Sequence, residues 1–233
     1  MTSFVGFFQL ADNLLRGEVA AARGSREERL PLLGSLIVAI VVYGMFYGAI
    51  MGSYGATSGL RIWQAVYSAV KVPFLLITTF LLSLPSFFVL NTLLGLRDDF
   101  SRVVLALIST QAGLTVILSA LAPFTAFWYV SGSDYEPAIL FNGLMFAVAS
   151  FSAQWMLRRQ YAPLIRGNPR HRWMLGTWIL IYVFVGIQMG WVLRPFIGNP
   201  KAPVQFFREG AWSNAYVFVL QMIWDVLNGR GRS

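Results

Sequence analysis

Few residues in this sequence are of the types that perform catalysis or bind metals. The chain has one histidine, His171, and no cysteine. Without cysteine there is no disulfide, no thiolate nucleophile and no cysteine-ligated metal site. His171 lies between Arg170 and Arg172, with no carboxylate near it in the sequence. We therefore expect a solvated imidazole rather than a metal ligand.

Two adjacent carboxylates, Asp98 and Asp99, are the other groups that could do chemistry. A divalent cation needs more oxygen ligands than this pair supplies. Aspartate is favoured at the start of a helix, where backbone amides lack partners, so the sequence predicts helix capping. Neither a GxxxxGK[ST] nucleotide loop nor an HExxH zinc motif occurs. We expect no catalytic residue, no cofactor and no metal, and hence no enzyme.

Gln111, preceded by Ser109 and Thr110, gives the one polar cluster near the middle of a long apolar segment. A buried amide in such a segment usually forms an interhelical hydrogen bond of about 0.6 to 2 kcal/mol. We favour this structural role over the alternative, a contact with a transported substrate. Ion-coupled carriers place Asp, Glu or His within their spans, and the five spans predicted below contain none.

Long helices that cross a membrane must position these residues. The 233 residues are 57% hydrophobic and 12% charged, whereas soluble domains carry about 25% charged residues. A helix needs about 20 apolar residues to cross the hydrocarbon core. Segments that fit this requirement lie at residues 31–53, 72–94, 103–125, 138–156 and 173–193. The sequence therefore predicts an all-α, polytopic transmembrane helix bundle with about five spans.

The predicted five-span domain covers residues 30–194, and the segments on either side are expected to lie at the membrane surface. Residues 1–29 have the apolar spacing of an amphipathic cytoplasmic leader helix, the alternative being a tail that packs against nothing. Residues 195–233 form a C-terminal tail. Within it, residues 214–227 indicate a short interfacial or re-entrant helix, or, as the alternative, a tilted sixth span.

Gly44, Gly48 and Gly52 repeat every four residues in the first span. Small residues at this spacing let two helices approach until their backbones touch. We expect these glycines to pack against another helix of the same chain. The less favoured alternative is a face that pairs with a second copy.

Successive loops lie on alternate sides of the membrane, and the basic residues are divided unequally between the two sides. Eleven lie on the side of the N-terminus, and two loop residues, Arg61 and Lys71, lie on the other. Basic loops are retained in the cytoplasm, so a cytoplasmic N-terminus in the cytoplasmic (inner) membrane is predicted. Five of the eleven follow the fourth span and are candidates to bind anionic lipid headgroups: Arg158, Arg159, Arg166, Arg170 and Arg172. Because the basic residues lie between apolar spans, the net charge of +8 does not indicate a nucleic-acid partner.

Acidic residues mark the turn after the third span. Asp134 and Glu136 lie there among aromatic residues, a composition typical of the membrane interface. With five spans Arg194 reaches the same side, and the sequence suggests that Asp134 and Arg194 pair. These three residues are also candidates for contacts with a partner protein on the outer face.

The segment from residue 71 to residue 122 resembles the bacterial side of the Yip-type domain family. It reads KVPFLLITTFLLSLPSFFVLNTLLGLRDDFSRVVLALISTQAGLTVILSALA. Like the family hairpin, it joins two spans by a short glycine-containing turn and an F-x-R/K entry, here Gly95, Phe100 and Arg102. The tail that begins RPFIGNP at Arg194 is longer than the family's. The resemblance implies a five-helix membrane protein with a cytosolic N-terminus. Eukaryotic relatives bind small GTPases in vesicle traffic, but no functional residue carries over.

These features together predict a non-enzymatic integral membrane scaffold or accessory subunit. Its partners would be membrane lipids, preferentially anionic on the cytoplasmic side, and other membrane protein subunits or further copies of itself. The alternative is an oligomeric channel or carrier for a small neutral or anionic solute, assembled around the three glycines or around Gln111. A lipid-processing enzyme ranks third, because the sequence has no evident nucleophile or acid–base pair.

Overall fold

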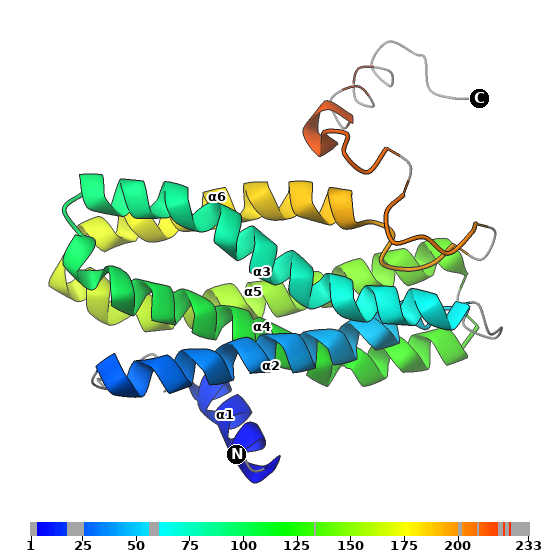
Figure 1. Ribbon diagram of the computed structural model, residues 1–233, viewed down its shortest axis with the longest axis horizontal. Coiled ribbons are helices and arrows are strands. Elements are labelled where there is room, and N and C mark those ends of the chain that lie inside the picture. The colour runs from blue at the N-terminus through cyan, green and yellow to red at the C-terminus, as the bar shows by residue number, and fades with distance from the viewer. Residues whose placement is uncertain are drawn as a thin grey trace.

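The computed structural model describes residues 4–17, 26–55, 61–132, 134–199, 202–208 and 210–218, together with residues 221 and 224. Within these residues we find helices and no strand, so the all-α prediction is confirmed. Figure 1 shows α2 to α6 running lengthwise in one bundle, with α1 projecting from it. The elements are α1 (Phe4–Arg16), α2 (Arg26–Gly52), α3 (Ile62–Leu93), the short 3-10 helix η2 (Arg97–Asp99), α4 (Phe100–Val130), α5 (Tyr135–Gly167) and α6 (Arg170–Leu193).

Five of these helices are long and apolar enough to cross a membrane: residues 30–52 of α2, α3, η2 with α4, α5, and α6. The chain is therefore a multi-pass membrane protein by the length and composition of its helices. One of them, α5, has 33 residues, which at 1.5 Å per residue is about 50 Å. Because the hydrocarbon core is about 30 Å thick, its ends must extend past the hydrocarbon unless the helix is strongly tilted.

Two helices extend well beyond the spans predicted from hydropathy. The second span was expected to begin at residue 72, but α3 begins at Ile62 and continues through Pro73. The fourth was expected to end at residue 156, but α5 continues to Gly167. An apolar window ends at the first cluster of charged residues, whereas a helix continues for as long as its charged side chains can reach water.

The order of packing puts α4 in the middle of the bundle. α2 packs against both α3 and α4, α5 packs against α4, and α6 packs against α3. In the apolar window of α4, 72% of the residues are buried, against 17% for α6. Each of the three apolar clusters of the bundle contains residues of α4, among them Leu107, Leu118 and Val116. α4 is therefore the most buried helix of the bundle, whereas α6 exposes most of its side chains on the outside of the bundle.

The bundle has two ends, which we name after one residue each. The Asn168 end carries the turns between α3 and α4 and between α5 and α6. The Phe196 end carries the C-terminal end of α2, the turn between α4 and α5, and the segment 194–199 that follows α6 (Figure 1).

The segments on either side of the bundle are described in part. α1 is not a tail that packs against nothing, because Ala11 and Leu14 are buried in one cluster with Leu36 of α2 and Leu105 of α4. The rest of the predicted leader up to α2 lies largely outside the described residues. In the tail, residues 215–218 are helical. Most of the helix predicted at 214–227 lies outside the described residues.

Candidate functional site

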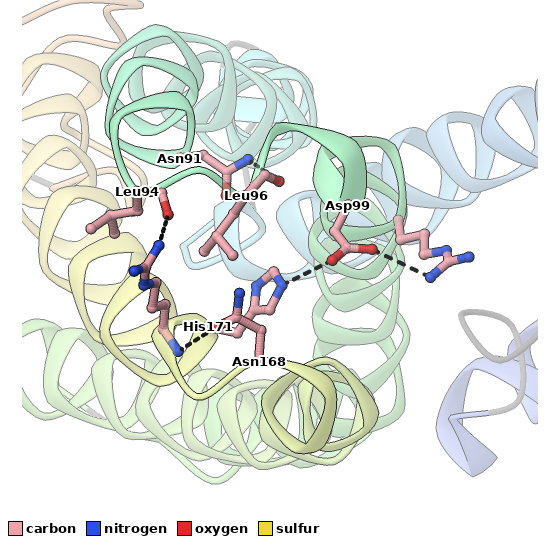
Figure 2. A network of polar contacts seen from close by, with 8 residues as sticks. Asn91, Leu94, Leu96, Asp99, Asn168 and His171 are labelled. Carbon is pink, nitrogen blue, oxygen red and sulfur yellow. Dashed lines mark hydrogen bonds and ion pairs between the residues drawn. The ribbon is translucent and has the colours of Figure 1, made fainter.

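The turn between α3 and α4 is fixed by a glycine and a buried amide. Gly95 has φ of 72°, a conformation that glycine adopts without steric cost. Asn91 is fully buried and donates from Nδ2 to the carbonyl oxygen of Leu96 at 2.9 Å. This bond, drawn in Figure 2, sets the position of the residues that follow, including Asp99.

Arg170 joins this turn to the turn between α5 and α6. The backbone N–H of Arg170 donates to Asn168 Oδ1 at 3.1 Å. Its guanidinium donates from Nη1 to the carbonyl oxygen of Leu94, also at 3.1 Å (Figure 2). The α3–α4 and α5–α6 hairpins are thus bonded to each other at the Asn168 end.

His171 lies inside this end of the bundle and is fully buried, so the prediction of a solvated imidazole is wrong. Its Nε2 lies 3.2 Å from Asp99 Oδ2, and Asp99 Oδ1 accepts a bond from Arg102 Nη1 at 3.3 Å. The carboxylate is distant in the sequence and adjacent in space, as Figure 2 shows. Asp99 occupies the N-cap position of α4, as the capping prediction expects, but its carboxylate makes no side-chain capping bond.

The surroundings of the His171–Asp99 pair can be compared with those of a catalytic triad and of a metal site. A triad would need a nucleophile bonded to the other imidazole nitrogen. His171 Nδ1 has no hydrogen-bond partner among the described residues, and the Tyr161 ring packs edge-on against the imidazole at 6.2 Å between centroids. Within the part of the chain that the structure describes, no three His, Asp or Glu side chains gather to hold a metal ion. What the pair does in the fold is to join the first turn of α6 to the turn before α4.

Exposed arginines surround this network, and we call them the basic surface. Two are in the turn before α4 or in its first residues, and five are on α5 and α6: Arg97, Arg102, Arg158, Arg159, Arg166, Arg170 and Arg172. The last five were predicted to occupy a loop. The structure instead has Arg158, Arg159 and Arg166 on the final turns of α5 and the other two on the first turn of α6.

The three spaced glycines of α2 face α3 within the chain. A Cβ atom at Gly48 would collide with the backbone of Ser68, and one at Gly52 would lie 2.7 Å from the carbonyl oxygen of Gln64. At Gly44 the nearest atom would be Pro73 Cβ, 3.3 Å away. This side of α2 is therefore occupied by α3.

Gln111 is bonded inside the bundle too. The Tyr182 hydroxyl on α6 donates to Gln111 Oε1 at 2.8 Å, and both Ser109 and Gln111 are buried. Ser109 Oγ donates to Gln160 Oε1 on α5 at 3.0 Å. The polar cluster of α4 thus links α4 to α5 and to α6.

At the Phe196 end the suggested pair of Asp134 and Arg194 is not formed. Asp134 and Glu136 are exposed, and the ion pairs of the described residues do not include either of them. The Arg194 guanidinium lies over the Trp191 ring, 3.2 Å from its centroid. Cation–π stacking thus replaces the ion pair, since Trp191 is on the same chain segment and needs no loop to bring it close.

The sequence interpretation missed a polar contact between α3 and segment 194–199. Lys71, fully buried, donates from Nζ to the carbonyl oxygen of Pro195 at 2.7 Å. Ser68 Oγ donates to the carbonyl oxygen of Phe196, and Gln64 Nε2 does so at 3.2 Å. An ionisable group therefore lies inside a span after all. The signal was present as the i, i+4, i+7 spacing of Gln64, Ser68 and Lys71, which puts all three on one helix face.

A second missed network joins α2, α4 and α5 near the same end. Tyr47 OH donates to Asn142 Oδ1 at 3.2 Å, and Asn142 Nδ2 donates to Tyr129 OH at 2.7 Å. Tyr129 OH in turn donates to the carbonyl oxygen of Met51 at 3.0 Å. These residues lie in apolar segments, where the sequence gives no sign of which polar groups meet.

Comparison of this chain with protein-family models, with curated proteins and with solved structures finds no match. The resemblance of residues 71–122 to the Yip-type family stays a prediction. Support for a function therefore comes from the contacts and surfaces of the chain itself.

Proposed function

We propose that this chain is a non-enzymatic membrane scaffold or accessory subunit whose basic surface holds anionic lipid headgroups. The observation that carries the proposal is the gathering of seven exposed arginines at the Asn168 end. In the orientation predicted from the loop charges, this end faces the cytoplasm. A basic side chain beside an anionic leaflet contributes about 1 kcal/mol of attraction.

The charge of the basic surface is mostly not neutralised from within. Among the ion pairs of the described residues, one involves this surface, Arg102 with Asp99 at 3.3 Å. Arg170 uses its guanidinium on a backbone carbonyl, which leaves its charge uncompensated. The arginines of α5 and α6 are thus suited to phosphate groups, to which guanidinium can bind through two parallel hydrogen bonds.

The role as an accessory subunit is supported by large apolar side chains on the outer faces of α5 and α6. Phe151 and Trp155 on α5 are 74% and 61% exposed, and Leu180 on α6 is 71% exposed. In a bilayer such faces contact either lipid chains or the helices of another membrane protein. Purification from native membranes with mass spectrometry tests for a partner. A chain that is recovered alone in every preparation would count against the accessory role.

The lipid part of the proposal is tested with nanodiscs that contain equal amounts of phosphatidylglycerol and phosphatidylcholine. Native mass spectrometry of the released protein should show preferential retention of phosphatidylglycerol. Replacing the five arginines of α5 and α6 by glutamine should lower the number of phosphatidylglycerol molecules retained, whereas replacing the same five by lysine should keep most of them. If the glutamine variant retained phosphatidylglycerol like the wild type, the basic surface would not be the lipid site.

The channel or carrier remains the alternative to this proposal. The two features suggested for its assembly both have partners within the chain, since α3 covers Gly48 and Tyr182 binds Gln111. Solute flux into liposomes that contain the purified protein, lost on Gln111→Leu, would favour the carrier over the scaffold.

A further inference from the structure

Two adjoining pockets open at the Phe196 end, far from the basic surface. One has a volume of about 440 Å³ and the other of about 460 Å³, and both lie within the range of about 300 to 1,000 Å³ that is usual for small-molecule sites. They share a wall made by Tyr135 and Ile139 of α5 and by Pro195 and Arg208. A ligand could therefore occupy both at once, with one part in each.

The first pocket, which we call the polar pocket, is lined by cationic and amide groups. Gln64 of α3 and Arg61, the residue before α3, line one side of this pocket. Asn199 and Arg208, from the segment after α6, line it as well. Its described lining includes no Asp or Glu. The charge of this pocket is complementary to an anionic group.

The second pocket, which we call the apolar pocket, continues from the polar one along α5. Met51, Leu75, Phe146 and Ile197 contribute apolar walls, and Arg194 lies among its lining residues. From Tyr135 to Phe146 it follows about 16 Å of helix. Such a depth runs from the level of an interfacial tyrosine into the hydrocarbon region. The shape and the lining suit an alkyl chain.

Positive charge is concentrated where the two pockets meet. Burial, and after it the charge of Arg208, lower the pKa of the Arg194 guanidinium. The backbone N–H of Arg208 donates to the carbonyl oxygen of Arg194 at 3.3 Å, which holds the two residues together. An anion beside these two residues would favour the charged form of both guanidinium groups.

We propose that these pockets bind one anionic membrane lipid, with its charged head in the polar pocket near Arg208 and one acyl chain in the apolar pocket. A soluble anion would leave the apolar pocket unused, and an uncharged lipid would make no use of the positive charge of Arg208. The lipid would enter from the leaflet that meets the Phe196 end. This site is separate from the basic surface, so it does not depend on the function proposed above.

Gly143 offers a test that fills the apolar pocket without disturbing the fold. It lines that pocket, is exposed, and a Cβ atom added there would have no other atom within 4 Å. Gly143→Leu should therefore place a side chain in the space of the acyl chain. Gly176→Leu on α6 is the matched control, because Gly176 is also an exposed helical glycine with no atom near its Cβ and lines neither pocket.

Binding is measured on the full chain in an uncharged detergent, with palmitoyl lysophosphatidic acid as the probe. Monopalmitoylglycerol, with the same chain but no charge, and glycerol 3-phosphate, with the charged head alone, are the two comparison probes. We expect lysophosphatidic acid to bind at least tenfold more tightly than either. Gly143→Leu should weaken its binding at least tenfold, while Gly176→Leu should leave it unchanged.

The head position is tested with Arg208→Gln, for which Arg16→Gln is the control, because Arg16 is an exposed residue of α1 that belongs neither to the two pockets nor to the basic surface. Arg208→Gln should weaken the binding of lysophosphatidic acid at least fivefold and leave the binding of monopalmitoylglycerol unchanged. The control variant should change the affinity for neither probe. Wild-type affinity in Gly143→Leu would overturn the proposal. So would equal affinity for glycerol 3-phosphate, which would indicate a site for a free anion. Gly143→Leu and Arg208→Gln should both melt at the wild-type temperature. If Gly143→Leu fails to fold, the result for Arg208→Gln alone tests the proposal.

Discussion

His171 Nε2 lies 3.2 Å from Asp99 Oδ2, across 72 residues of sequence. This contact fixes the first turn of α6 to the turn that precedes α4. Because His171 is fully buried, its Nε2 would be left without a partner if Asp99 were removed. Asp99 contacts both the buried imidazole and the exposed Arg102, so it links the interior of the Asn168 end to its surface.

We expect Asp99→Ala to destabilise the protein more than Asp98→Ala. Loss of Asp99 leaves a buried imidazole nitrogen without a partner, which costs about 1 to 3 kcal/mol. Asp98 is exposed, and exposed substitutions usually change the free energy of unfolding by less than about 0.5 kcal/mol. Unfolding by denaturant in detergent micelles measures both. Equal effects of the two substitutions would show that the pair with His171 contributes no stability.

The number and type of the helices could be predicted because lipid leaves a clear signal in composition. Uncharged segments of sufficient length identified α2 to α6. The ends of α3 and α5 could not be placed, since helices continue into regions where charged side chains such as Arg158 and Arg166 reach water. Hydropathy indicates which part of a helix lies in lipid, but it does not indicate the residue at which the helix ends.

The site residues were harder to predict because their partners lie far away in the sequence. His171 has arginines on both sides along the chain, but in space it faces Asp99. Lys71 was counted as a loop residue, yet it is buried against the carbonyl oxygen of Pro195. The spacing of Gly44 and Gly48 did indicate close packing, because small residues four apart let any neighbouring helix approach closely, whichever helix it is.

Gly48→Ala should destabilise the bundle, and Gly34→Ala on the same helix should not. A Cβ at Gly48 would collide with the backbone of Ser68, whereas one at Gly34 would meet nothing within 4 Å. Overpacking of this kind costs about 1 to 3 kcal/mol, while alanine is the better helix former at an open site. Thermal unfolding in a monomeric micellar preparation separates the two. If Gly48→Ala unfolded like the wild type there and lost only self-association, a face between copies would be supported instead.

Gln111 and Tyr182 should be energetically coupled. Their hydrogen bond of 2.8 Å joins α4 to α6 inside the bundle, and polar interhelical bonds of this kind contribute about 0.6 to 2 kcal/mol. A double-mutant cycle of Gln111→Leu and Tyr182→Phe isolates that contribution from the separate cost of each change. Additive effects on the free energy of unfolding would mean that the bond does not stabilise the bundle. Gln111 would then be available for another role.

Lys71→Met should loosen segment 194–199 while leaving the rest of the bundle intact. Methionine keeps most of the apolar stem but removes the ammonium that bonds the carbonyl oxygen of Pro195. A hydrogen bond from a charged group contributes about 1.5 to 3 kcal/mol, so hydrogen exchange in peptides covering residues 194–208 should become about tenfold faster or more. Peptides from the Asn168 end are the internal control, because no contact of Lys71 reaches them. Unchanged exchange in residues 194–208 would mean that Gln64 and Ser68, which bond the neighbouring Phe196 carbonyl, hold the segment without the lysine.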